Sequence, residues 1–86
     1  MKYIHIYMAD GTYKKREAPS KPSLEEMQQI VGGYIEPLRV EHEGHIRTMV
    51  VNEEGKLIRL PLNIRASEIA GREIVGNVFI LEGYRM

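Results

Sequence analysis

Three arginines in the middle of the chain, Arg39, Arg47 and Arg59, have the side chains best suited to bind an anion. A guanidinium group is planar and donates two parallel hydrogen bonds, which matches the geometry of phosphate and carboxylate groups. Tyr34 and Tyr84 could stack on a flat ring beside such a group. The sequence therefore suggests a site for a small, nucleotide-like anion. The competing interpretation is that the arginines form ordinary ion pairs with glutamates on a solvated sheet face.

The separation of these arginines depends on the loop at Glu53–Gly55, which we expect to join two antiparallel strands. A three-residue loop places Arg59 diagonal to Arg47 on the same face of the sheet. A four-residue loop moves Arg59 opposite Thr48 and Arg39. Either register brings two arginines within reach of one anionic group.

The chain has three histidines, His5, His42 and His45, and no cysteine. A two-residue turn at Glu43 and Gly44 would place His42 and His45 opposite one another, as half of a metal site. The sequence pattern does not place a third ligand near these two histidines, whereas structural zinc sites use four ligands. We therefore predict an exposed turn pair, with neither a metal site nor a cofactor.

Glu36 and Asn63 complete the candidate site residues. Together with His42 or His45 they could form a small acid/base site, which is the enzymatic alternative. No serine, histidine and acid fall into a recognisable catalytic motif. The expectation is therefore a protein without enzymatic activity, in which Glu36 and Asn63 belong to a ligand-binding site.

The spacing of apolar residues predicts the elements that position these side chains. Ser23 and Asn63 are suited to cap two helices, Glu26 is expected to reach back to Ser23, and Pro61 is expected to end a strand. Strands are expected at residues 2–8, 12–17, 34–42, 45–51, 56–60 and 76–81, and helices at residues 24–31 and 64–70. The predicted fold class is α+β in a single domain, residues 1–86: an N-terminal strand or hairpin, one helix, an antiparallel three-stranded meander, a short helix and a closing strand.

Charge and composition exclude several classes of protein. Twelve basic residues balance twelve acidic ones, so the basic excess that duplex DNA binders use is absent. No segment is long and apolar enough to span a membrane, and the first residues lack the unbroken apolar run of a signal peptide. A soluble protein located in the cytoplasm is expected.

Residues 45–51 and 56–60 carry apolar side chains at both alternating sets of positions. Strands of this kind are covered on both faces of their sheet. One short helix covers only part of one face, so we expect a second copy of the chain to cover the other. The prediction is a homodimer.

Several stretches resemble a known family. They are GGYIEPLRV, MVVNEEGKLIRLPLNIRAS and IVGNVFIL, and together they run from about Gly32 to Leu81. This pattern is similar to the small domain of unknown function 3846, found in bacteria, phages and other mobile elements. One departure is Asn77, which stands where the pattern leads us to expect an aspartate. The resemblance implies a fold and no particular reaction.

The expected function is that of a small binding or accessory protein, encoded by a phage or mobile element, that captures a host protein or a small ligand. A more specific alternative, suggested by the resemblance together with the arginines and tyrosines, is a counter-defence protein that sequesters a nucleotide signal. The enzymatic alternative remains the acid/base site near Glu36 and His42 or His45.

Overall fold

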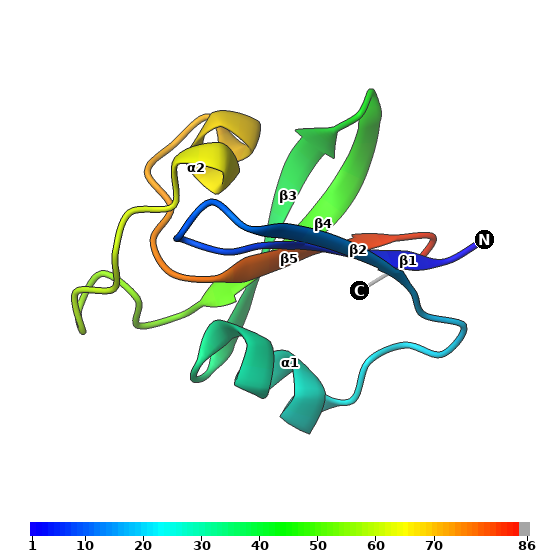
Figure 1. Ribbon diagram of the computed structural model, residues 1–86, viewed down its shortest axis with the longest axis horizontal. Coiled ribbons are helices and arrows are strands. Elements are labelled where there is room, and N and C mark those ends of the chain that lie inside the picture. Colours follow the sequence, from blue (N-terminus) through cyan, green and yellow to red (C-terminus); the bar gives the residue numbers. More distant parts are fainter. Residues whose placement is uncertain (85–86) are drawn as a thin grey trace.

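Five strands form among residues 1–84, which are the residues that the computed structural model describes. They form one antiparallel sheet, and two helices lie on it (Figure 1). The strands are β1 (Tyr3–Tyr7), β2 (Tyr13–Glu17), β3 (Ile35–His42), β4 (His45–Asn52) and β5 (Val78–Glu82), and the helices are α1 (Leu24–Val31) and α2 (Ile64–Ala70). The predicted α+β fold class is confirmed.

The closing strand β5 is the centre of the sheet, whose order is β2-β1-β5-β4-β3. Its residues Val78 to Leu81 are buried on both faces, because β5 lies between β1 and β4 and a helix covers each face. The prediction of a closing strand is confirmed. The edge strand β3 accommodates Pro37, since an edge position does not need every backbone N–H.

The helix α1 begins and ends where its capping residues predict. The Ser23 hydroxyl accepts a hydrogen bond from the Glu26 backbone N–H at 3.1 Å, and Gly32 ends the helix with φ 81°. The expected return contact from the Glu26 carboxylate to Ser23 is wrong, because that carboxylate pairs with Arg16 of β2. An arginine partner satisfies the carboxylate and ties the helix to the edge of the sheet.

The two helices cover opposite faces of the sheet, α2 above and α1 below in the view of Figure 1. Met49 and Ile80 pack toward α2, while their neighbours Val50 and Phe79 pack toward α1. Each face therefore has its own helix. The argument that a second copy must cover a bare face does not apply, although the homodimer itself stays a prediction.

The expected strand at residues 56–60 is wrong. Residues 53–59 form consecutive turns, and Arg59 has a left-handed backbone with φ 57°. The place beside β4 is taken by β5, whose Val50–Phe79 pairing buries both side chains completely. Leu57 stays 78% exposed, so the segment around it offers less apolar burial than β5 does.

Candidate functional site

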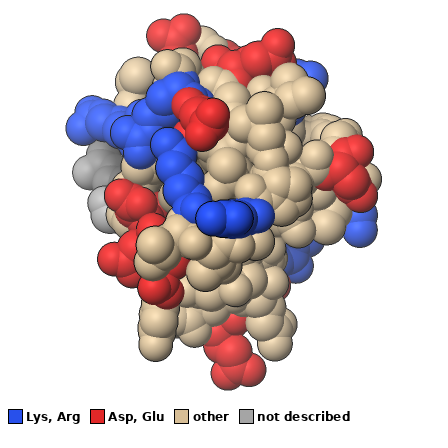
Figure 2. Space-filling model, turned by 90° about the vertical axis from the view of Figure 1, so that its left-hand side faces the viewer, with Lys and Arg blue, Asp and Glu red and all other residues tan. Residues whose placement is uncertain are grey.

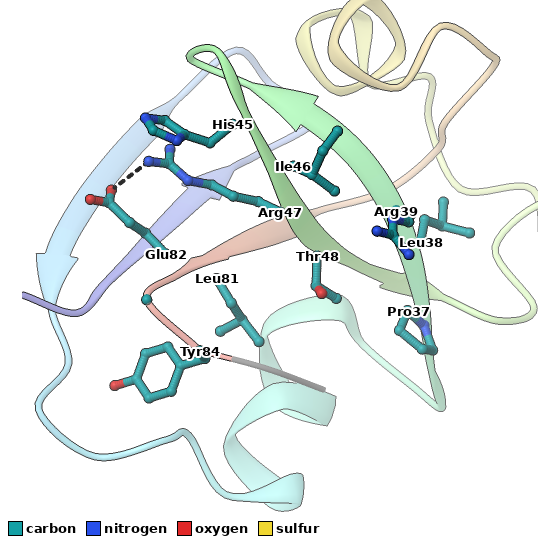
Figure 3. A pocket seen from close by; sticks show the side chains of 11 residues that line it. Pro37, Leu38, Arg39, His45, Ile46, Arg47, Thr48, Leu81, Glu82 and Tyr84 are labelled. Carbon is teal, nitrogen blue, oxygen red and sulfur yellow. Dashed lines mark ion pairs between the residues drawn. The ribbon is translucent and has the colours of Figure 1, made fainter.

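A groove lies between the β3–β4 hairpin and the end of β5 (Figure 3). It forms because β4 pairs with β5 only from Thr48 to Val50, so the rest of the hairpin projects beyond the sheet as a two-stranded ribbon. The groove has a volume of about 850 Å³. Its lining residues are Pro37, Leu38, Arg39, His45, Ile46, Arg47, Thr48, Leu81, Glu82, Gly83 and Tyr84.

The groove combines a cation, a hydroxyl, an apolar floor and an aromatic ring. Figure 3 shows Tyr84 at one end and Arg39 at the other, with Leu81 and Thr48 between them. The Tyr84 hydroxyl donates to the carbonyl of Ser20 at 2.9 Å, which fixes the position of the ring. Arg39 is exposed, and none of the ion pairs between described residues involves it. An anion entering the groove could therefore bind the Arg39 guanidinium without first displacing a carboxylate from it.

Arg47 is held far more tightly than Arg39. Its Nη1 donates to His42 Nδ1 at 2.8 Å and to Glu43 Oε1 at 3.0 Å, and its Nη2 lies 3.7 Å from Glu82 Oε1. The Arg47 side chain is 12% exposed. It connects the groove to a buried polar cluster under the ribbon, and its donors are largely used within the protein.

That cluster, the histidine cluster, consists of the buried residues His5, His42 and Tyr7 together with the exposed Tyr13 and the partly exposed Glu82. His5 and His42 are 0% and 4% exposed, and their ring centroids lie 4.7 Å apart in an edge-to-face contact. Each imidazole also contacts a phenol, His5 with Tyr13 at 2.8 Å and His42 with Tyr7 at 2.8 Å. Every polar group of the cluster that is buried therefore has a partner.

The donors around His42 determine its protonation. Arginine only donates, so Nδ1 of His42 accepts and its proton lies on Nε2, which donates to the Tyr7 oxygen. Burial lowers the pKa of His42, and the neighbouring His5 and Arg47 lower it further. His42 is therefore a neutral imidazole at neutral pH.

The other groups of the cluster respond to the same surroundings. Burial raises the pKa of Tyr7 and of Tyr13, so both phenols keep their protons at neutral pH. The hydrogen bond from His5 lowers the pKa of Glu82, which is therefore an ionised carboxylate. The neutral imidazole of His42 thus lies next to the Arg47 guanidinium, whose positive charge faces the Glu82 carboxylate.

His5, His42 and Glu43 offer three ligand atoms that all lie within 4.8 Å of one another. The Arg47 guanidinium contacts both His42 Nδ1 and Glu43, so it takes the place that a cation would need. A metal ion would have to displace Arg47, and the arrangement as it stands does not fit one. His45 lies opposite His42, as predicted, and is exposed outside this group. The predicted exposed pair is wrong for His42, which is buried.

Sequence reasoning did not find the histidine cluster. Residues 2–8 were predicted as a strand, on which His5 and Tyr7 alternate with the aliphatic Ile4 and Ile6 and so share one face. A histidine flanked by tyrosines on a strand was the available signal. Its partners come from β2, β3 and β5, so only the assembled sheet shows that this face is buried.

The structure separates most of the predicted site residues. Arg39 and Arg47 line the same groove, whereas Arg59 lies in the turns outside it. Tyr34 is 64% exposed beside α1, in a different hollow. Glu36 lines a third cavity, of about 340 Å³, together with Leu57 and Arg72.

Asn63 is 1% exposed and has a structural role. Its Nδ2 donates to the carbonyls of Tyr7 and Gly76, and its Oδ1 accepts from the Ala66 N–H as the cap of α2. Glu36 and His42 lie six residues apart on β3, which corresponds to about 20 Å of strand. The structure therefore does not bring Glu36, Asn63 and the hairpin histidines together.

The fold and the groove define a small α+β domain with one antiparallel sheet, a helix on each face and a projecting hairpin. A family model described as "Domain of unknown function (DUF3846)" matches residues 1–85, and the chain belongs to this family. The match includes the N-terminal hairpin, which the sequence patterns covered only loosely. Searches among curated proteins and among solved structures give no match.

The departure at Asn77 has a structural explanation. Its Oδ1 accepts a hydrogen bond from the backbone N–H of Ala9 at 2.9 Å, and a carboxylate oxygen could accept the same bond.

In the part of the chain that the structure describes, no helix is long and apolar enough to cross a membrane.

Proposed function

We propose that this protein is a non-enzymatic binding protein whose groove takes a small anion that carries a flat ring. The observation that supports the proposal is the combination of exposed Arg39 and the fixed ring of Tyr84 in one groove. Arginine provides a bidentate contact for a phosphate group, and tyrosine a stacking surface for a base. A nucleotide-like molecule has both features.

The size of the groove agrees with this ligand class. Its volume of about 850 Å³ falls within the range of ordinary small-molecule sites. Leu81 and Ile46 supply apolar contact area, and Thr48 supplies a hydroxyl between them. In its more specific form, the proposal is that the protein sequesters a nucleotide signal, as a phage counter-defence protein does. This form also proposes that the protein is encoded by a phage or mobile element.

The test is a titration with nucleoside mono-, di- and triphosphates and cyclic dinucleotides, followed through the backbone amide signals of Ile46 and Thr48 by NMR. We expect at least one of these compounds to shift both signals. Arg39→Ala should weaken that binding about tenfold or more, because a charge-assisted hydrogen bond contributes roughly 1.5–3 kcal/mol.

Arg59→Ala is the matched control, since Arg59 is also exposed but lies outside the groove. It should leave the affinity unchanged. Equal losses in the two variants would contradict the groove and favour a site that includes the turns. If no compound shifts Ile46 or Thr48, the nucleotide-like ligand is excluded.

A second surface favours association with another copy of the chain. Leu57, Ile58, Leu62 and Ile64 are 78%, 54%, 49% and 67% exposed, and all belong to the segment at the left of Figure 1. Figure 2 faces this side of the molecule and shows a wide uncharged area beside a band of basic side chains. Exposed apolar area of this kind marks interaction sites. We propose that the homodimer forms through this surface.

Sedimentation equilibrium tests the dimer. The wild-type protein should sediment as a dimer, and Leu57→Asp should sediment as a monomer, because each buried charge without a partner opposes association. Ile46→Asp is the control, since Ile46 is 61% exposed in the groove and not on this surface. A monomeric wild-type protein, or dissociation by Ile46→Asp alone, would contradict this interface.

A further inference from the structure

The phenol of Tyr13 is joined to a carboxylate through a buried imidazole. The Tyr13 hydroxyl lies 2.8 Å from His5 Nδ1, and His5 Nε2 lies 2.7 Å from Glu82 Oε1. Three strands supply the three groups: β2, β1 and β5, which are neighbours in the sheet. This is the order hydroxyl, imidazole, carboxylate that activates a nucleophile in hydrolases, with a phenol in place of an aliphatic hydroxyl.

The hydrogen-bond directions follow from Glu82. An ionised carboxylate only accepts, so His5 carries a proton on Nε2 and donates it to Glu82. In the tautomer with its single proton on Nε2, Nδ1 has a free lone pair that can accept from the Tyr13 hydroxyl, 2.8 Å away. His5 is 0% exposed, so packing on all sides holds it in this orientation. The geometry is that of a base positioned to take the phenolic proton.

Tyr13 differs from the other members of the histidine cluster because it is the most exposed of them, at 46%. An incoming molecule can therefore approach it from solvent. The charges close enough to affect Tyr13 are the carboxylates of Glu43 and Glu82 and the cations of Lys15 and Arg65. The two cations, on β2 and α2, could attract a phosphoryl group and stabilise the negative charge of its oxygens.

We propose that Tyr13 is a nucleophile toward tetrahedral phosphorus or sulfur centres, with His5 as its general base and Glu82 as the residue that positions His5. With a phosphoanhydride, the Tyr13 oxygen forms a bond to phosphorus while the bond to the leaving phosphate breaks. The phenolic proton moves to Nδ1 of His5. The product is a phosphotyrosine, so the reaction is stoichiometric and does not depend on the groove ligand.

An aryl sulfonyl fluoride tests this nucleophile directly. It forms a sulfur–oxygen bond with a phenol, fluoride leaves, and the phenolic proton goes to the base. The rate at each tyrosine is measured by peptide mass spectrometry. Tyr34 is the internal control, because it is more exposed, at 64%, and makes no side-chain hydrogen bond among the described contacts. We expect Tyr13 to react at least tenfold faster than Tyr34.

Two variants identify the base and the positioning residue. His5→Gln should reduce the Tyr13 rate to that of Tyr34 and leave the Tyr34 rate unchanged. Glu82→Gln should lower the Tyr13 rate and change its pH profile between about pH 5 and 8, the range in which histidines change charge. A purely structural role for Glu82 would not change that profile.

His5→Gln replaces a fully buried residue, so a variant that fails to fold is recognised by circular dichroism. In that case Glu82→Gln tests the proposal, because the Glu82 side chain is 25% exposed and its replacement keeps the shape of the side chain. Equal rates at Tyr13 and Tyr34 in the wild-type protein would overturn the proposal. An unchanged rate and pH profile in Glu82→Gln would overturn the assignment of His5 as an oriented base.

Discussion

Replacing Asn63 with alanine is expected to lower the free energy of unfolding by about 3–5 kcal/mol. The substitution removes three hydrogen bonds in a site that is 1% exposed. It leaves the carbonyls of Tyr7 and Gly76 and the N–H of Ala66 without these partners, and each unsatisfied buried group costs roughly 1–3 kcal/mol. Urea unfolding followed by circular dichroism measures the change.

Ser23→Ala is the matched control for this prediction. Ser23 caps α1 in the same way that Asn63 caps α2, but its site is exposed. Water replaces the lost bond there, so the expected loss is only about 1 kcal/mol. Similar losses in the two variants would mean that Asn63 acts as a cap alone and does not join β1 to the segment before β5.

The stability of the protein should fall as the pH is lowered from about 7 to about 5. Burial, His5 and Arg47 lower the pKa of His42 in the folded state, whereas an unfolded histidine keeps an ordinary pKa of about 6.5. Below that pH the unfolded state binds a proton that the folded state does not, so folding loses free energy as the pH falls. One proton accounts for at most about 1.4 kcal/mol per pH unit, and because uptake begins near pH 6.5 the loss between pH 7 and 5 is at most roughly 2 kcal/mol.

Urea unfolding of His42→Gln and His45→Gln at several pH values tests the origin of this dependence. His42→Gln should remove most of the loss between pH 7 and 5. His45→Gln should keep it, because His45 is exposed. Glu43 and Glu82 have lowered pKa values, so their stabilising contribution is present above about pH 4.5 and is lost below it, outside this window. A dependence that survives in His42→Gln would contradict the neutral, buried state of His42.

Local signals in the sequence were sufficient for the elements that depend on neighbouring residues. The α1 helix follows from its apolar spacing and from Ser23 and Gly32, which act on the backbone within a few residues of themselves. The β3–β4 hairpin follows from the turn between His42 and His45. The α2 helix was likewise predicted from Asn63 at its start.

Competition between distant segments decided the rest of the sheet. Residues 56–60 and β5 were both candidates for pairing, and the position next to β4 went to β5, which buries four consecutive residues, Val78 to Leu81. Sequence periodicity describes each segment separately and cannot rank them, because the gain from burial depends on what lies on both faces. The predicted proximity of Arg59 and Arg47 depended on that ranking and was lost with it.

The sequence by itself determined the fold class and the helix ends, because these depend on residue type and short-range spacing. The tertiary structure decided which side chains meet. Arg39 and Arg47 line one groove because the β3–β4 hairpin extends beyond the residues of β4 that pair with β5. His5 reaches Glu82, 77 residues away in the chain, because β1 and β5 pair in one register. Such contacts arise from burial shared between distant strands, for which the sequence carries no local signal.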